Sequence, residues 1–220
     1  QTYDGEFEIL IGDDGSTDGT PEFVEETYGD RVRVFRQANA GPGPARNLAA
    51  RHAQGEYLAL LDSDDAFLPW TLETYRELIQ TQGPLSLIVG REHETKDLDQ
   101  IPQLDRGPTQ ARRFDSLFAS RMAAKTLATD RLTVRKDVFD SLEGFTGEVM
   151  NGEDVDFYIR AGLSEGYLVI ESPITFVRRY HEQQISLDPL PAFKGRMFLL
   201  DQEERNAYPG GKPYLKHRRE

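Results

Sequence analysis

The stretch Leu58-Ala59-Leu60-Leu61-Asp62-Ser63-Asp64-Asp65 decides how the rest of the chain is interpreted. Its short apolar run ends in three aspartates, and an uninterrupted run of this length predicts a strand buried on both faces of a sheet. Ligands of open α/β sheets bind outside the carboxyl ends of such strands. Because alternate side chains of extended backbone share a face, we expect Asp62 and Asp64 to point the same way.

Carboxylates this close together repel one another, and a shared proton or a bound cation relieves the repulsion. Mg²⁺ and Mn²⁺ prefer oxygen ligands, and Mg²⁺ sites typically combine carboxylates with waters and substrate phosphates. We therefore predict that the aspartates hold a divalent cation for a sugar-nucleotide diphosphate, where it would stabilise the charge on the leaving group. The alternative is a solvated acidic turn, with Asp65 near a helix start.

Strands and helices alternate over the first ninety residues, which predicts a parallel α/β sheet with right-handed crossovers. The expected strands there are 7–11, 32–35, 57–61 and 85–89, and the expected helices are 20–28, 45–53 and 69–81. After an irregular stretch at 91–109, we expect helices at 112–124, 136–142 and 191–204, a helix between Asp154 and Gly166, and strands at 132–134, 167–170 and 174–177.

The composition restricts the function classes. At 220 residues with 38% hydrophobic side chains, the chain can bury a core, and one domain is the default. A net charge of −12 argues against a nucleic-acid binder, and the absence of cysteine excludes disulfides and thiolate metal sites. Without a secretory signal or an apolar run of about 20 residues, we expect a cytoplasmic protein. The basic cluster Lys216-His217-Arg218-Arg219 leaves open a peripheral membrane contact, although a solvated terminus is the simpler interpretation.

Further polar stretches suit a nucleotide-sugar site. Asp13-Asp14-Gly15-Ser16 follows a strand and precedes a helix, where carboxylates suit hydrogen bonds to a base or ribose, although a turn with a helix cap would use the same residues. Glu153-Asp154 begins a helix; acidic residues there complement the helix dipole, and one could also take a proton from an acceptor hydroxyl. The remaining candidates for phosphate or metal contacts are Arg46, Arg178, Arg179 and His181.

In their order and spacing, these stretches resemble glycosyltransferase family 2, whose members have the GT-A fold and use nucleotide sugars. The resemblance extends over residues 1–187. The motifs that carry it are Glu8-Ile9-Leu10-Ile11-Gly12-Asp13-Asp14-Gly15-Ser16-Thr17-Asp18, Asn39-Ala40-Gly41 with Ala45-Arg46-Asn47, Gly55-Glu56-Tyr57 leading into Leu61-Asp62-Ser63-Asp64-Asp65, Gly152-Glu153-Asp154-Val155-Asp156, and Arg178-Arg179-Tyr180-His181 through Ser186.

The resemblance implies a Rossmann-like, mostly parallel sheet flanked by helices, and a metal-dependent, inverting transfer of a sugar from a nucleoside-diphosphate sugar, with a UDP-sugar as the expected donor. The acceptor would be a hydroxyl of a saccharide or a lipid-linked molecule, in the synthesis of cell-envelope polysaccharide, glycolipid or another glycoconjugate. Residues 1–90 would bind the nucleotide sugar, residues 91–187 would form the acceptor and catalytic half, and 188–220 would be a C-terminal helix and tail. The alternatives are a retaining transferase or nucleotidyltransferase on a similar scaffold, and an inactive sugar-nucleotide-binding domain.

The same resemblance implies roles for individual residues. Asp154 would be the base that deprotonates the acceptor, with Glu153 assisting acceptor binding. Asp14 would contact the nucleoside base. The implied nucleotide-sugar contacts are Asp13, Asp14, Arg46, Asp62, Ser63, Arg178 and Arg179. The implied ligands of a Mn²⁺ or Mg²⁺ ion are Asp62, Asp64, Asp65 and His181.

The chain departs from the family pattern at its start, where the family has an apolar strand and a helix before the segment that matches Gln1-Thr2. In this fold that strand lies between the strand ending at Asp13 and the one ending at Asp62, so we expect both to keep an unpaired edge. Our hypothesis is that the sequence is a piece of a longer protein. An intact mass showing a natural start at Gln1, together with cooperative unfolding, would contradict it.

Overall fold

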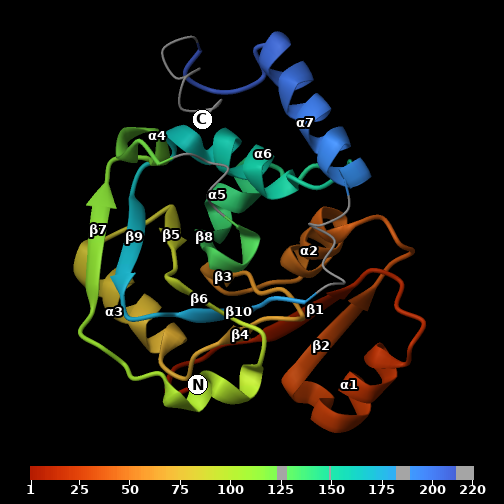
Figure 1. Cartoon of the computed structure of the whole chain (residues 1–220), viewed down its shortest axis with the longest axis vertical. Coiled ribbons are helices and arrows are strands. Elements are labelled where there is room, and N and C mark those ends of the chain that lie inside the picture. The colour runs from red at the N-terminus through yellow and green to blue at the C-terminus, as the bar shows by residue number, and fades with distance from the viewer. Residues whose placement is uncertain (123–127, 149, 182–188, 212–220) are drawn as a thin grey trace.

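The computed structural model describes residues 1–122, 128–148, 150–181 and 189–211 (Figure 1). Its helices are α1 (Thr20–Tyr28), α2 (Pro42–Arg51), α3 (Thr71–Gln82), α4 (Leu117–Ser120), α5 (Lys136–Ser141), α6 (Glu153–Arg160) and α7 (Pro189–Glu204). Its strands are β1 (Ile9–Asp13), β2 (Val32–Arg36), β3 (Tyr57–Ala59), β4 (Ala66–Phe67), β5 (Leu87–Val89), β6 (Glu92–Thr95), β7 (Gln110–Phe114), β8 (Leu132–Arg135), β9 (Tyr167–Ser172) and β10 (Phe176–Arg179).

The central sheet has five strands in the order β3-β8-β5-β9-β7. β5 and β9 are parallel, whereas β8 runs antiparallel to both β3 and β5, and β7 runs antiparallel to β9. The predicted α/β architecture, a sheet flanked by helices, is therefore confirmed. The expected mostly parallel pairing is wrong for this sheet, which is mixed: β8 runs in the reverse direction between β3 and β5, and only β5 and β9 are parallel. Because β8 is reversed, the residues just before it lie beside the residues that follow β3.

Helices cover both faces of this sheet. The side chains of Leu87 and Val89 on β5 pack into the cluster that includes Phe157 of α6, whereas Ile88 packs on the opposite side against Tyr75 of α3. All three β5 side chains are fully buried. The strand can be apolar at every position because neither face meets water, as the apolar run at residues 85–89 predicted.

The strand that precedes the aspartate cluster is shorter and more exposed than expected. β3 ends at Ala59, and although Leu58 is buried, the side chain of Leu61 is 41% exposed. The prediction of burial on both faces is therefore wrong for the end of this run. β3 lies at the edge of the sheet, where β8 is its strand partner, and the chain leaves the sheet before Leu61.

The predicted helix at 112–124 is also wrong within the described residues. Strand β7 occupies Gln110–Phe114, and helix α4 begins only at Leu117, capped by the Ser116 hydroxyl, which accepts a hydrogen bond from the Ala119 amide at 3.2 Å. Phe114 packs against the same core cluster as the buried Leu117 and Phe118. The apolar residues of strand β7 and helix α4 together have the spacing expected for one face of a single helix, which explains the wrong prediction. The expected loop at 91–109 likewise contains β6 and a 3₁₀ segment at Leu98–Gln103.

The strands ending at Asp13 and before Asp62 belong to different sheets. β1 pairs with β2 in a separate two-stranded parallel sheet. Within the described ranges, the other edge of β1 and the outer edge of β3 have no strand partner. These are the two unpaired strand edges that the sequence analysis expected. A third sheet, β4-β10-β6, places the end of β10 beside the segment that follows the aspartates.

Candidate functional site

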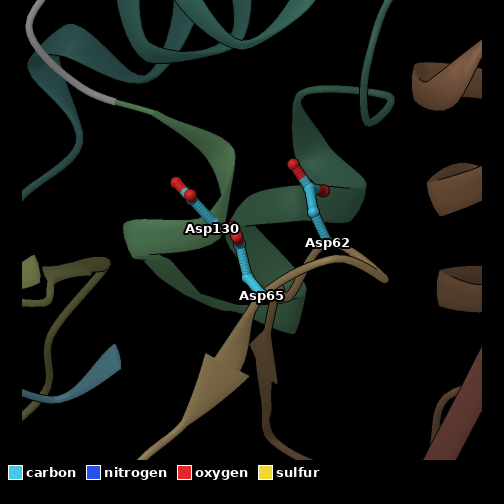
Figure 2. A group of neighbouring side chains, drawn as sticks. All are labelled: Asp62, Asp65 and Asp130. Atoms are coloured by element: carbon cyan, nitrogen blue, oxygen red, sulfur yellow. The ribbon is translucent and has the colours of Figure 1, made fainter. Parts of the chain in front are cut away.

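Residues 62–65, which lie shortly after strand β3, form a turn. The Asp65 amide donates a hydrogen bond to the Asp62 carbonyl at 3.1 Å, and Ser63 is exposed within the turn. Carboxylate oxygens of Asp62, Asp65 and Asp130 lie within 4.8 Å of one another (Figure 2). The backbone is not extended here, so the expectation that Asp62 and Asp64 share a face is wrong: the turn pairs Asp62 with Asp65.

Asp130 is the site residue that the sequence interpretation missed. It lies in the 3₁₀ turn Thr129–Arg131 just before β8, is 3% exposed, and its Oδ1 atom has no hydrogen-bond partner. Burial raises the pKa of Asp130 to about 8, and its hydrogen bond with Asp65 and the charge of Asp62 contribute. The signal in the sequence was an acidic residue, Asp130, just before the apolar run of β8. It indicates a place in the site only when β8 is known to run antiparallel to β3.

Asp64 points to a different partner. Its Oδ2 atom lies 2.9 Å from Nε2 of His181, and the Arg179 amide donates a hydrogen bond to Oδ1 of Asp65 at 2.9 Å. Antiparallel pairing of β10 with β4 brings these residues to the turn from more than a hundred positions away. The structure thus brings together Asp62, Asp64, Asp65, Arg179 and His181 around one turn.

Arg178, the other arginine of this segment, faces Glu94, with 4.0 Å between Nη1 and Oε1. Its positive charge also lowers the pKa of Asp130, against the stronger effect of burial. Arg178 therefore lies beside the acidic cluster but has no hydrogen bond to it among the described contacts. Ser186, the last residue of the matching motif, lies outside the described residues.

Arg46 joins the acidic turn to the start of α6. Its guanidinium contacts Oδ1 of Asp62 at 2.5 Å through Nη2 and Oε1 of Glu153 at 2.8 Å through Nη1. The Arg46 side chain is 16% exposed, and that of Glu153 is 9% exposed. The planar fork of arginine suits two carboxylates at once, which lysine could not satisfy with the same geometry. The predicted donor contact of Arg46 is thus, in this structure, a bridge between two acidic residues.

Asp154 stands next to this bridge, at the start of α6. It is half-buried, and its Oδ1 atom accepts a hydrogen bond from the Val155 amide at 2.7 Å. Burial raises the pKa of Asp154 to about 6, and the charge of Glu153 adds to this, whereas Arg46 acts in the opposite direction. A carboxylate with a pKa just below neutral is well suited to accept a proton at physiological pH.

The two aspartates at the end of β1 have different surroundings. The carboxylate of Asp14 accepts hydrogen bonds at 2.8 Å from the Gln37 side chain and from the Ala40 and Gly41 amides. Asp13 is buried, and its pKa is lowered by its hydrogen bonds with Ser16. Asp14 thus fixes the loop that begins α2, the helix that carries Arg46.

The arrangement fits a divalent cation. Three carboxylate oxygens converge, the buried Oδ1 atom of Asp130 lacks a partner, and the His181 nitrogen lies at the same turn against Asp64. Oxygen ligands with a single imidazole are donors that Mn²⁺ and Mg²⁺ sites accept. The sets that could hold such an ion are therefore the three convergent aspartates and the neighbouring pair Asp64 and His181.

Comparison with known proteins relates the chain to sugar-transferring enzymes. The family described as glycosyl transferase family 2 matches residues 1–140. An uncharacterized glycosyltransferase of Rickettsia felis is 47% identical over 77 residues, which are 34% of this chain and 12% of the relative. The chondroitin synthase of Pasteurella multocida is 27% identical over 207 residues, covering 91% of this chain and 20% of the relative. The chain thus spans only a small part of these two relatives.

A solved structure shares the fold. The crystal structure of S. aureus TarS 1–349 in complex with UDP-GlcNAc superposes with a TM-score of 0.62 at 22% identity, covering 83% of this chain and 53% of that one. At this identity the likeness supports the fold rather than the specificity.

We predict that Arg46→Met destabilises the protein. The substitution leaves the buried Glu153 carboxylate without its ion pair, and breaking a buried pair in this way costs about 3–5 kcal/mol. Urea unfolding at neutral pH measures the loss. Arg51→Met, on the exposed side of the same helix, should change the free energy of unfolding by less than about 0.5 kcal/mol. Equal stabilities of the two variants would show that the bridge contributes little.

We predict that Asp130→Asn weakens the pH dependence of stability. An unfolded aspartate has a pKa of about 3.9, whereas the folded pKa is raised to about 8. Between these values the folded state holds a proton that the unfolded state has released, so the free energy of unfolding falls as pH rises, by up to about 1.4 kcal/mol per pH unit. The amide does not titrate and removes this term.

Urea unfolding in the presence of EDTA at several pH values from about 5 to 8 tests this prediction. Asp105→Asn, at an exposed site, should keep the slope of the parent protein. An unchanged slope in Asp130→Asn would mean that Asp130 titrates normally.

Proposed function

Because the chain belongs to glycosyl transferase family 2, we propose that it transfers a sugar from a UDP-sugar to a hydroxyl acceptor, with inversion at the anomeric carbon and with Mn²⁺ or Mg²⁺. The proposal rests on the Arg46 bridge, which joins the acidic turn at Asp62 to the start of α6. The turn suits a metal-bound diphosphate, and the half-buried Asp154 carboxylate at the start of α6 suits the role of proton acceptor. The UDP-GlcNAc bound to TarS supports the donor class, and a relative named chondroitin synthase supports a saccharide acceptor.

The acidic turn would form the donor end of the site. A bound divalent ion would act as a Lewis acid that stabilises the negative charge on the departing diphosphate. We assign Asp62, Asp64, Asp65 and His181 as its ligands, with Asp130 as an additional carboxylate from the start of β8. The Ser63 hydroxyl, exposed in the turn, suits a hydrogen bond to the ribose, and Arg178 and Arg179 bring positive charge for the diphosphate.

Asp154 would act at the acceptor end. The acceptor hydroxyl attacks the anomeric carbon while Asp154 accepts its proton, and the bond from that carbon to the diphosphate breaks in the same displacement. Attack from the side opposite the leaving group inverts the configuration. Glu153, held by Arg46, keeps the start of α6 in place beside the acceptor.

The nucleoside would lie at the end of β1. Asp13 and Asp14 follow that strand, and the loop they hold leads directly into α2 and Arg46. Because the Asp14 oxygens already accept hydrogen bonds from the loop, we propose that Asp14 shapes the pocket for the base. Loss of this carboxylate would remove the hydrogen-bond acceptor of both the Ala40 and the Gly41 amide.

We predict that Asp154→Asn lowers sugar transfer by about 10²-fold or more, because the amide cannot accept the proton. Affinity for UDP should stay within about twofold, since Asp154 is not assigned to the donor. In the parent enzyme, kcat/KM should rise as pH increases through about 6, where the pKa of Asp154 lies. Transfer assays and UDP calorimetry across pH measure both effects.

The exposed Asp30→Asn variant provides the matched control and should retain activity and pH profile. Retained turnover in Asp154→Asn would remove Asp154 as the base. A product with the donor's anomeric configuration would replace the inverting mechanism with a retaining one, and the absence of transfer or hydrolysis of any sugar nucleotide with Mn²⁺ would leave only a binding domain.

We predict that Asp64→Asn lowers the affinity for Mn²⁺ by at least about tenfold, since one carboxylate ligand is lost and His181 loses its acidic partner. Calorimetric titration with Mn²⁺ alone measures this, and Asp105→Asn should bind like the parent. If Asp130→Asn strongly lowered the affinity for Mn²⁺ and Asp64→Asn left it unchanged, the ion would instead bind among Asp62, Asp65 and Asp130.

A further inference from the structure

Asp156 is a buried acidic residue that the proposed reaction does not use. It is the last residue of the acidic motif at the start of α6, and it is 2% exposed. At about 100° per residue, it lies on a different side of the helix from Asp154. A buried charge lowers stability unless it is paired and hydrogen-bonded. The partners of this carboxylate therefore indicate its role.

Both oxygens of Asp156 accept a hydrogen bond. Oδ2 accepts one at 2.8 Å from Nε of Arg160, one turn further along α6, and Oδ1 accepts one at 2.9 Å from the Tyr208 hydroxyl. Tyr208 is 5% exposed, and burial, together with the charge of Asp156, raises the pKa of Tyr208, so that its hydroxyl stays protonated and donates. Donors from two parts of the chain thus fix the orientation of the carboxylate.

Arg160 connects Asp156 to the end of α5. Its Nη1 atom donates to the Leu142 carbonyl at 2.6 Å, and its Nη2 atom donates to the Gly144 carbonyl at 2.7 Å. Both carbonyls belong to residues 142–145, which follow α5 and are called the α5 loop below. Because the guanidinium is planar, the hydrogen bond from Nε to Asp156 also fixes the directions of the two Nη atoms.

The α5 loop is attached to the helix that carries Arg46. The Asn47 side chain donates to the Phe145 carbonyl and accepts from the Phe145 amide, both at 2.8 Å. The buried Phe145 ring packs against Arg46, with 5.5 Å from Cζ to the ring centroid, where a guanidinium is attracted to the ring face. Gly144 is so close that a Cβ there would lie 2.3 Å from Oδ1 of Asn47. A shift of the loop would therefore change the surroundings of Arg46.

The C-terminal segment, blue in Figure 1, supports the same region at a second point besides Tyr208. The Asn151 amide donates a hydrogen bond to the Pro191 carbonyl of α7 at 3.2 Å. Gly195 of α7 is buried, and a Cβ at this position would collide with the Asn151 carbonyl. Since Asn151 lies two residues before Glu153, α7 holds the segment that leads into α6.

We propose that Arg160 is a positioning residue for the proposed transfer. Oriented by Asp156, it holds the α5 loop against α2 and so keeps Arg46 between its two carboxylate partners, one after β3 and one at the start of α6. Arg160 itself has no assigned contact with the donor or the acceptor. The catalytic consequence rests on the proposed function, whereas the position of Arg46 has a readout that needs no turnover.

That readout is the pKa of Asp154. Burial and the negative charges of Glu153 and Asp62 raise this pKa to about 6, whereas the hydrogen bond from the Val155 amide and the positive charge of Arg46 lower it. If Arg46 is held less firmly, its lowering effect weakens, and the pKa of Asp154 rises further.

The first test is Arg160→Lys, which keeps the positive charge beside Asp156 but loses the planar fork that serves three partners. The pKa of Asp154 should rise by roughly half a unit or more, a part of the roughly 1–3 units that a neighbouring cation supplies. Carboxyl-carbon NMR titration in the presence of EDTA measures this pKa, and Asp154→Asn identifies the signal.

In transfer assays of Arg160→Lys, the pH at which kcat/KM reaches half its maximum should move up with the NMR value. We also expect kcat to fall about tenfold or more, because small misplacements of catalytic groups are costly. Tyr208→Phe removes only one hydroxyl and should change both quantities in the same direction by less. The matched controls, Arg51→Lys and Tyr28→Phe at exposed positions, should behave like the parent.

Thermal unfolding verifies that each variant is folded, and Tyr208→Phe decides the test if Arg160→Lys is not. An unchanged pKa of Asp154 in the folded variants would overturn the proposal, as would an equal shift in Arg51→Lys. A raised pKa of Asp154 in Arg160→Lys, with a parent chain that transfers no sugar, would support the contacts from Arg160 to Arg46 and reject the proposed function instead.

Discussion

The guanidinium of Arg46 is the interaction on which the site depends. Two carboxylates, one after β3 and one at the start of α6, come close enough to repel, and a single cation between them makes their approach favourable. Arg46 can occupy that place because Asp14 fixes the loop that begins α2. The position of α6, and with it that of Asp154, therefore depends on a chain of contacts that begins at the end of β1.

Local patterns predicted much of this structure. The limits of α1 follow from the proline at its start and the glycine after Tyr28, and the run at 85–89 indicated a buried strand before its partners were known. The acidic character of the turn after β3 was also predictable, because Asp62, Asp64 and Asp65 are near neighbours in the sequence. The partners of these residues were not. Asp130 reaches the turn only through the reversed strand β8, and the bridging role of Arg46 requires α6 to be in place.

The site also buries two carboxylates in surroundings that disfavour their charged forms. Burial raises the pKa of both Asp130 and Asp154, which means that each would be more favourable in water when charged. Perturbed groups of this kind cluster at functional sites. The stability that they forgo is offset by the apolar core on both faces of the central sheet, where the side chains of β5 are fully buried.

The close approach of Gly195 to Asn151 has a consequence for the length of α7 as well as for its composition. A one-residue insertion between Gly195 and Met197 would rotate the later part of the helix by about 100° relative to the packed contact. The exposed side chains of Met197 and Leu200 would then no longer lie on the helix face that carries the exposed Leu190 and Phe193. This segment should therefore tolerate substitutions better than insertions or deletions, because the packed contact of Gly195 with Asn151 fixes the rotation of the helix about its axis.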